Sequence, residues 1–289
     1  MIEWYYLVII SAVLMALATI VEKRALKVEH ATQFSAAFSL IIALVSLIFI
    51  PLANFTISPF QWLLLIVGSL ISAATYLIQA RVFKHGSLSI ATPASGALPI
   101  VFVAFLAYIF LGERLDLVQY LSLAGIVAGT YLILFRKMSK DGHDFDGNKY
   151  RYMIILNGIL SAAGFVIGKY QLLSVDVLAY LVITQILIAI EFVIYISLKY
   201  NGLKEIENTI RTYRSPLIMT VALTLGYRIA FFYALSSPLA LISAASPLRN
   251  AVFVIITVLA GGMMFKEEGL LKKIAISIAL LIFSFILIA

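Results

Sequence analysis

The sequence contains no cysteine, and Asp, Glu, Lys and Arg together make up only 12% of its 289 residues. A chain without cysteine has no disulfide, no thiolate nucleophile and no cysteine-bound metal. Its three histidines, His30, His85 and His143, lie too far apart for paired-ligand spacings such as HExxH. Phosphate-binding glycine motifs and a Ser/His/Asp set are absent as well. We therefore predict a protein that is not an enzyme and holds neither a metal nor another cofactor.

The scarcity of charge goes with an abundance of apolar residues. Hydrophobic residues form 63% of the chain and mean hydropathy is +1.07, whereas soluble domains are about 45–50% apolar. A soluble fold of this size has too little interior to hide that much apolar surface. This composition excludes a cytosolic enzyme and a nucleic-acid-binding module. The net charge of +7 is typical of a membrane protein with basic cytoplasmic loops.

A transmembrane helix needs about 20 mostly apolar residues, and ten runs of the sequence approach or exceed this length. Most loops between them are short, so consecutive helices should be antiparallel neighbours. We predict an all-α polytopic protein with ten transmembrane helices, integral to the lipid bilayer. The predicted spans are 4–21, 32–52, 60–80, 88–111, 117–135, 152–170, 176–198, 215–235, 239–264 and 269–288.

The ten spans divide into two similar groups of five. In the fourth span Pro93 precedes Glu113 by 20 residues, and in the ninth Pro247 precedes Glu267 by the same 20 residues. Each glutamate is followed by one more apolar run. We predict a first five-helix repeat at 1–138, a polar linker at 139–150 and a second repeat at 151–289.

An odd number of spans in each repeat means that the second repeat crosses the membrane in the opposite direction. The basic residues agree, because 17 of the 21 Lys and Arg lie in the segments that follow the odd-numbered spans. Basic loops are cytoplasmic as a rule. We therefore expect both ends of the chain outside the cell and the protein in the plasma membrane. The other four basic residues are Arg114, Lys169, Arg228 and Arg249.

Several local motifs occur in corresponding places of the two halves. The first half has GSLSIATP at 86–93 and LGERL at 111–115, and the second has PLRN at 247–250 and KEE at 266–268. In this order they resemble the drug/metabolite transporter superfamily, specifically its ten-helix EamA-type members. The resemblance covers essentially the whole chain, although FKEEG replaces the usual GER in the second half. It implies a secondary carrier that works by alternating access, with a central cavity between two inverted halves.

Three charged residues lie deep inside predicted spans, namely Glu191, Arg228 and Arg249. A charge at the bilayer centre costs about 2.5–3.5 kcal/mol on insertion scales, so each needs a reason. In one interpretation, Glu191 forms a buried ion pair with Arg228 or Arg249. In the other, an arginine faces the cavity and its planar fork holds a carboxylate or phosphate of the substrate. A second role open to Glu191 is coupling of transport to protons.

The surroundings of Arg249 favour the second interpretation. Pro247 lacks the N–H that would bond the carbonyl of Ser243, so we expect a break in this helix. The prolines at 93 and 99 predict a matching break in the fourth span, and a substrate site between two interrupted helices is what an inverted-repeat carrier predicts. The predicted substrate site comprises Arg249, Asn250, Ser246, Arg228, Tyr227, Tyr76, Gln79 and Ser95, with helix breaks at Pro93, Pro99 and Pro247.

Other polar residues near the ends of spans have simpler interpretations. Glu113 and Glu267 start the last helix of each half, where a carboxylate suits the positive end of the helix dipole. Lys23 and Lys169 end equivalent helices and either reach the interface or face an entrance. The spacing of apolar residues in 199–214 fits a short interfacial helix or a solvated loop equally well.

We predict a secondary-active transporter of small polar organic solutes, such as amino acids or related anionic or zwitterionic metabolites. Two alternatives are an exporter of cations that uses Glu191 and a lipid-headgroup flippase. The expected partners are a small-molecule substrate and the bilayer, with no nucleic acid, and the protein is a monomer or a homodimer. Isolated amides such as Gln185 and Asn157 should bond between helices.

Overall fold

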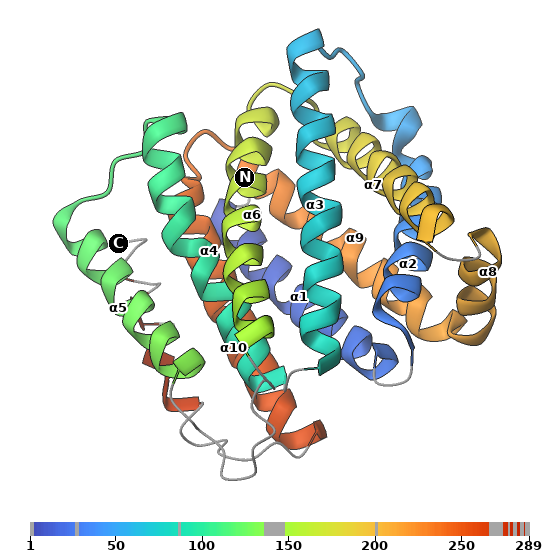
Figure 1. Cartoon of the computed structure of the whole chain (residues 1–289). Helices are drawn as coiled ribbons and strands as arrows, with labels where there is room; N and C mark the ends of the chain where they lie inside the picture. Colours follow the sequence, from blue (N-terminus) through green and yellow to red (C-terminus); the bar gives the residue numbers. More distant parts are fainter. Residues whose placement is uncertain are drawn as a thin grey trace.

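Every regular element in the described part of the computed structural model is a helix, and that part contains no strand. The structure describes residues 3–26, 29–85, 88–135, 148–199 and 202–265, together with 274–276, 278–279, 282–283 and 286. The helices are α1 (Trp4–Leu26), α2 (Ala31–Ser46) with the 3-10 helix η1 (Leu47–Leu52), α3 (Pro59–His85), α4 (Leu88–Leu111), α5 (Leu117–Phe135), α6 (Asn148–Leu172), α7 (Val177–Lys199), α8 (Leu203–Thr212), α9 (Arg214–Ser236) and α10 (Ile242–Phe265) (Figure 1).

The first nine predicted spans each coincide with helical segments of this structure. Within the described residues, seven helices are long and apolar enough to cross a membrane, and Leu98–Leu111 forms a shorter apolar helix. The protein is therefore a multi-pass integral membrane protein. Glu267 lies outside the described residues, and so does most of the predicted tenth span, 269–288. So does most of the predicted linker, whose last three residues, 148–150, begin α6.

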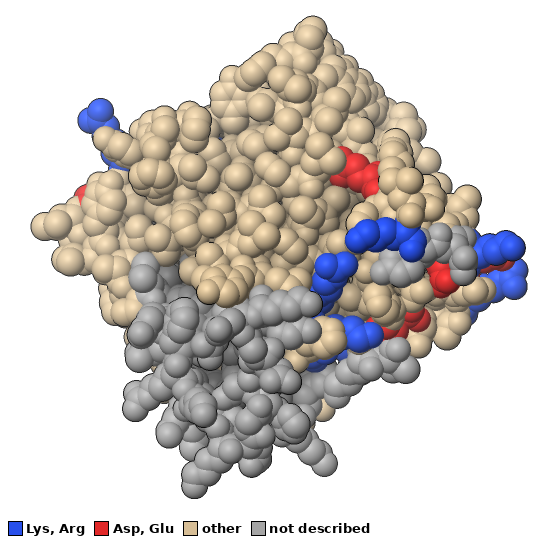
Figure 2. All heavy atoms as spheres, viewed as in Figure 1, with Lys and Arg blue, Asp and Glu red and all other residues tan. Residues whose placement is uncertain are grey.

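The spanning helices carry large apolar side chains on their outer faces and small or polar ones inside. On α3, Leu63, Ile66 and Leu70 repeat at helical spacing and are about half exposed, whereas Ser69 and Thr75 are buried. This distribution suits a bilayer, because lipid accepts the outer leucines and small residues let helices approach closely. Figure 2 shows a broad face without charge, with charged side chains gathered mainly near α8 and the adjoining helix ends.

Helices from distant parts of the chain pack against one another around the centre. In Figure 1, α3 and α6 stand in front of α1 and α9. The closest pairs are α1 with α9 and α10, α6 with α3 and α4, α4 with α10, and α2 with α7. Smaller contacts join α3 to α7 and α2 to α9. Segments of the first half therefore contact the second half more than they contact each other.

Buried charged groups near the helix ends satisfy backbone atoms of distant helices. The carboxylate of Glu113 accepts hydrogen bonds from the backbone N–H of Ile242 at 2.9 Å and of Ser243 at 3.0 Å, and from the Ser243 hydroxyl. Glu113 does cap a helix N-terminus, as expected, but the helix is α10 and not the adjacent α5. The sequence could not reveal this, because the two partners are 129 and 130 residues away.

The two lysines that end equivalent helices are buried and serve as donors to helix C-termini. Lys169 Nζ donates to the carbonyls of Leu235 and Ser237, both at 2.8 Å, at the end of α9. Lys23 Nζ donates to the carbonyl of Phe83, near the end of α3. These carbonyls have no partner within their own helix, so a buried ammonium satisfies them where water cannot.

The segment between α7 and α9 contains the short helix α8, which settles the choice left open by the sequence. Its residues Ile206 and Thr209 are buried against the bundle, whereas the ion pair between Glu207 and Arg211, 2.6 Å long, is exposed. At its other edge Gln33 of α2 donates to the carboxylate of Glu205 at 2.6 Å. The helix therefore packs its apolar face on the bundle and leaves its charges outside.

A first prediction concerns the hydrogen bonds of Glu113 to the N-terminus of α10. Replacing Glu113 with Ala leaves two buried N–H groups of α10 without an acceptor, and losing hydrogen bonds to a charged group costs about 1.5–3 kcal/mol. We expect a lower thermal-unfolding midpoint for the purified protein in detergent. The neighbouring Arg114→Gln variant is the control, because Arg114 is exposed. Equal midpoints for the two variants would show that the cap does not stabilise the fold.

Candidate functional site

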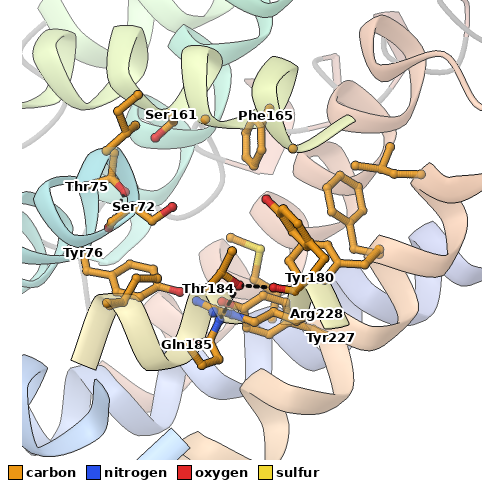
Figure 3. A pocket seen from close by; sticks show the side chains of 18 of the residues that line it. Ser72, Thr75, Tyr76, Ser161, Phe165, Tyr180, Thr184, Gln185, Tyr227 and Arg228 are labelled. Carbon is orange, nitrogen blue, oxygen red and sulfur yellow. Dashed lines mark hydrogen bonds between the residues drawn. The ribbon is translucent and has the colours of Figure 1, made fainter. Parts of the chain in front are cut away.

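A central cavity lies between α1, α3, α6, α7, α9 and α10. It measures about 920 Å³, counting the part that opens outward. Figure 3 shows side chains of α3, α6, α7 and α9 converging on this space, with Ser161 and Phe165 on the side opposite Tyr227 and Arg228. A mostly apolar cavity with a few converging polar groups is typical of small-molecule sites in proteins.

Arg228 of α9 is one of the two cations that line this cavity, and it is only 7% exposed. Its guanidinium carbon lies 5.0 Å from the ring centroid of Tyr76 and 5.9 Å from that of Tyr227. Cations over aromatic faces are stabilised by about 2 kcal/mol when desolvated. The two tyrosines therefore hold the guanidinium in place without neutralising its charge.

Arg249 of α10 has a similar environment and is 4% exposed. Its guanidinium carbon lies 3.8 Å from the ring centroid of Phe231 and 4.9 Å from that of Phe165. The Nε atom is buried and has no hydrogen-bond partner among the residues that the structure describes. The two rings are T-shaped to each other, with centroids 6.2 Å apart and an interplanar angle of 69°, so they contact the guanidinium from adjacent sides. The donors that point away from the rings can still bind an anion.

Two smaller cavities adjoin the central one and share its lining residues Met15 and Gln79. The first lies between α4, α6 and α10 and has Ser95, Asn157 and Asn250 in its wall. The second lies between α1, α2, α3 and α9. Gln79 of α3 therefore stands at the junction of all three cavities, as its place in the predicted site requires.

Several buried polar atoms around these cavities have no partner in the described part of the chain. Unpaired buried polar atoms are uncommon in proteins, so a group of them beside one cavity indicates a ligand-binding surface. Asn250 differs from them, because its Nδ2 donates to the carbonyl of Gly96 on α4 at 2.8 Å. The unpaired cavity atoms are Ser95 Oγ, Asn157 Oδ1, Gln185 Oε1 and Arg249 Nε.

One interpretation of the sequence paired Glu191 with an arginine, and no such ion pair is formed among the described residues. Among the described residues the one salt bridge joins Arg211 and Glu207. Glu191 instead accepts a hydrogen bond from Ser69 of α3 at 2.6 Å, and its other carboxylate oxygen is buried without a partner. It does not line the three cavities. The physical reason is its position along the helix. Glu191 lies about two turns beyond Thr184 on nearly the same face of α7, so it contacts Ser69 of α3 past the end of the cavity lining.

The helix breaks expected at the prolines do not occur. Both α4 and α10 are continuous helices, and Pro93 and Pro247 each occupy the sixth position of their helix. A proline this near the helix start removes one backbone hydrogen bond, and the rest of the helix is unaffected. Pro99 is buried within α4 and lines the cavity that contains Asn250.

Most of the predicted substrate-site residues lie together around the cavities. Arg228, Arg249, Tyr227, Tyr76 and Gln79 line the central cavity, and Ser95 and Asn250 line the cavity beside it. Ser246 is buried on α10 with its hydroxyl unpaired, outside the three cavity linings.

The sequence did not single out a further group of cavity residues. Most are small hydroxylated residues, which also bond their own helix backbone and so carry no distinctive pattern. Glu22 escaped notice because the predicted first span ended at residue 21, whereas α1 continues to Leu26. The additional lining residues are Glu22, Ser72, Thr75, Ser161, Tyr180, Thr184 and Gln185.

Spanning helices packed around a partly polar cavity define a multi-pass membrane protein with an internal cavity. Residues 2–135 match the sequence profile of the EamA-like transporter family. A protein of Sinorhizobium sp. described as "Uncharacterized transporter in cobO 3'region" is 38% identical over 72 residues. That match covers 25% of this chain and spans about half, 50%, of the curated relative.

One solved crystal structure, described only as that of a protein, superimposes on nearly the whole chain. The TM-score is 0.62 over 98% of this chain and 94% of the other, at 14% sequence identity. An identity this low shows that the two proteins share a fold. It carries no information about what either of them transports or binds.

Arg249 provides a test that separates a binding residue from a structural one. A charge in the hydrocarbon core costs about 2.5–3.5 kcal/mol, and ring stacking returns about 2 kcal/mol or more. We expect Arg249→Met to unfold at a midpoint equal to or above that of the wild type in detergent, because replacing a buried charge by an apolar side chain is often neutral or stabilising.

The matched control is Lys169→Met, which removes a buried cation that does have acceptors. This variant removes the ammonium donor of the Leu235 and Ser237 carbonyls, and Ser237 keeps only the bond from the N–H of Ala240. Its midpoint should therefore fall by the equivalent of about 1–3 kcal/mol. A loss of stability in Arg249→Met as large as that in Lys169→Met would make Arg249 a structural residue.

Proposed function

We propose that this protein is a secondary-active transporter that moves a small organic anion or zwitterion, such as an amino acid or a related metabolite, by alternating access. The observation that carries the proposal is Arg249, a guanidinium only 4% exposed, packed against two phenylalanine rings, with its Nε in the cavity wall and unpaired among the described residues. A buried cation that forms no salt bridge with a described residue is best explained by a bound anion that supplies the counter-charge.

Arg228 strengthens the preference for an anion. Both guanidinium groups line the same cavity, and neither forms a salt bridge with a described residue. A planar fork of donors matches the oxygens of a carboxylate or phosphate. Polar atoms such as Gln185 Oε1 and Asn157 Oδ1 provide acceptors for the N–H or O–H groups that a metabolite carries. Nothing in this lining favours a purely cationic substrate at Glu191.

The carrier architecture that we propose is a pair of inverted five-helix repeats, in which α1, α2, α3 and α4 correspond to α6, α7, α9 and α10. The helix pairs support it. The contact of α1 with α9 has its counterpart in α6 with α3, and that of α1 with α10 in α6 with α4. The two pairs α2–α7 and α4–α10 are their own counterparts, as expected at a twofold axis.

Individual contacts follow the same correspondence. Aligning Pro93 with Pro247 also aligns Gly96 with Asn250, and these two residues bond across the α4–α10 contact, 154 residues apart. Lys23 of α1 donates to the end of α3 as Lys169 of α6 donates to the end of α9. In such carriers, rocking of one repeat against the other opens a central site to alternate sides.

The first experiment is a binding screen on purified protein. Glutamate, glutamine, glucose 6-phosphate, AMP and choline are each tested for a rise in the thermal-unfolding midpoint, because a ligand that binds the folded state stabilises it. We expect stabilisation by at least one acid or zwitterion. Arg249→Gln should bind that compound at least about tenfold more weakly, since a hydrogen bond to a charged group is worth about 1.5–3 kcal/mol.

Arg249→Lys keeps the charge and loses the planar fork, so it should recover only part of the affinity. Arg114→Gln, an exposed arginine outside the cavity, should bind like the wild type. Stabilisation by choline alone, unchanged in Arg249→Gln, would contradict the proposal and favour a cation carrier.

The orientation is proposed from the basic residues, which put both chain ends outside the cell membrane. The cysteine-free sequence allows a direct measurement with single-cysteine variants in intact cells. Thr56→Cys lies in the exposed connection between η1 and α3, and Asn208→Cys lies on the exposed face of α8. A membrane-impermeant maleimide should label the variant at 56 and leave that at 208 unlabelled until the cells are opened. The reverse pattern would invert the proposed topology.

A further inference from the structure

A carboxylate that the proposed function does not use lies in the same cavity system as the two arginines. Glu22 of α1 lines the smaller cavity between α1, α2, α3 and α9. That cavity shares Met15, Tyr76, Gln79 and Tyr227 with the central one. Tyr227 is within electrostatic reach of both Glu22 and Arg249. Glu22 and the arginines therefore act on the same enclosed space.

Glu22 has no structural partner that would explain a carboxylate at this depth. It is partly exposed to its cavity and forms no salt bridge with another described residue. The adjacent Lys23 directs its ammonium to the carbonyl of Phe83 on α3. The carboxylate of Glu113, by comparison, already accepts hydrogen bonds from the backbone N–H groups at the start of α10. The carboxylate of Glu22 is the one that faces the ligand space.

The ionised side chains of the cavity walls can be counted from their lining residues. Within the described part of the chain, the three cavities contain two arginines, Arg228 and Arg249, and one acid, Glu22. Their other titratable residues are tyrosines, Tyr76, Tyr180 and Tyr227, which are neutral at pH 7. With Glu22 ionised and both arginines protonated, the walls carry a formal charge of +1.

We propose that Glu22 is a specificity-determining residue that sets the net charge of the transported anion at −1. A monoanion neutralises the walls, whereas a dianion leaves an excess negative charge and a neutral solute leaves an excess positive one. An uncompensated charge enclosed at low dielectric costs several kcal/mol, so the neutral complex is favoured. This inference rests on the proposed function, because it presupposes that an anion occupies the arginine cavity.

The test compares two acids with the same carbon skeleton and different charge. Succinate carries two negative charges at neutral pH and its monomethyl ester carries one. Their dissociation constants are measured by thermal shift on the purified wild type, Glu22→Gln and Glu191→Gln. The last variant removes a buried carboxylate outside the three cavities and is the control. Equal elution volumes in size-exclusion chromatography establish that all three proteins are folded.

We expect the wild type and Glu191→Gln to bind the monomethyl ester more tightly than succinate. In Glu22→Gln the walls carry two positive charges, so the ratio of the two dissociation constants should change by about tenfold or more in favour of succinate. A purely structural role for Glu22 would weaken both acids equally and leave the ratio unchanged, and that result would overturn the proposal. Glu22→Asp, which keeps the charge, should retain the ratio of the wild type.

The wild type alone already provides a decisive measurement if Glu22→Gln does not fold. Tighter binding of succinate than of its monomethyl ester by the wild type would overturn the proposed role of Glu22. It would not contradict the proposed function as an anion transporter. Binding of neither acid, together with binding of choline, would instead remove the proposed function itself. The two failures are therefore distinguishable.

Discussion

Two buried guanidinium groups, neither of which forms a salt bridge with a described residue, are the constraint around which the rest of the structure is arranged. Helices α9 and α10 place Arg228 and Arg249 in one cavity, and four aromatic rings hold them by their faces. Aromatic faces stabilise a cation without discharging it, which an ion pair would do. The guanidinium edges consequently remain available, and the surrounding helices contribute small polar groups where a membrane protein core would otherwise be apolar. We propose that an anion supplies the negative charge that this cavity lacks.

Much of the fold followed from composition and length. Apolar runs of about 20 residues have few alternatives to a spanning helix, so nine predicted spans coincide with helical segments, with ends shifted by a few residues. The shifts matter most for α1, whose last turn beyond residue 21 brings Glu22 into a cavity. The position of a helix start is uncertain in the sequence, and this uncertainty affected the prediction for the prolines. A proline in the second turn of a helix and a proline at a true break look the same in one dimension.

The site was predicted in part, and for a physical reason. An arginine inside a span has a high free energy of membrane insertion, and this alone singled out Arg228 and Arg249 as candidate residues. Which charges pair depends on helix rotation and on long-range packing, which one sequence does not reveal. Glu191 therefore faces Ser69 instead of an arginine, and Glu113 caps a helix 129 residues away. Serine and threonine hydroxyls can bond their own helix backbone at any position. No sequence pattern therefore distinguishes the ones that line the cavity.

The central claim is that the unpaired edge of Arg249 binds the anionic group of a transported solute. An experimental structure of the protein with the stabilising compound of the binding screen tests it most directly. The account predicts an acid oxygen of that compound within hydrogen-bond distance of Arg249 Nε, with the guanidinium still packed against Phe165 and Phe231. A compound bound elsewhere, with Arg249 paired to a carboxylate of the protein itself, would contradict it.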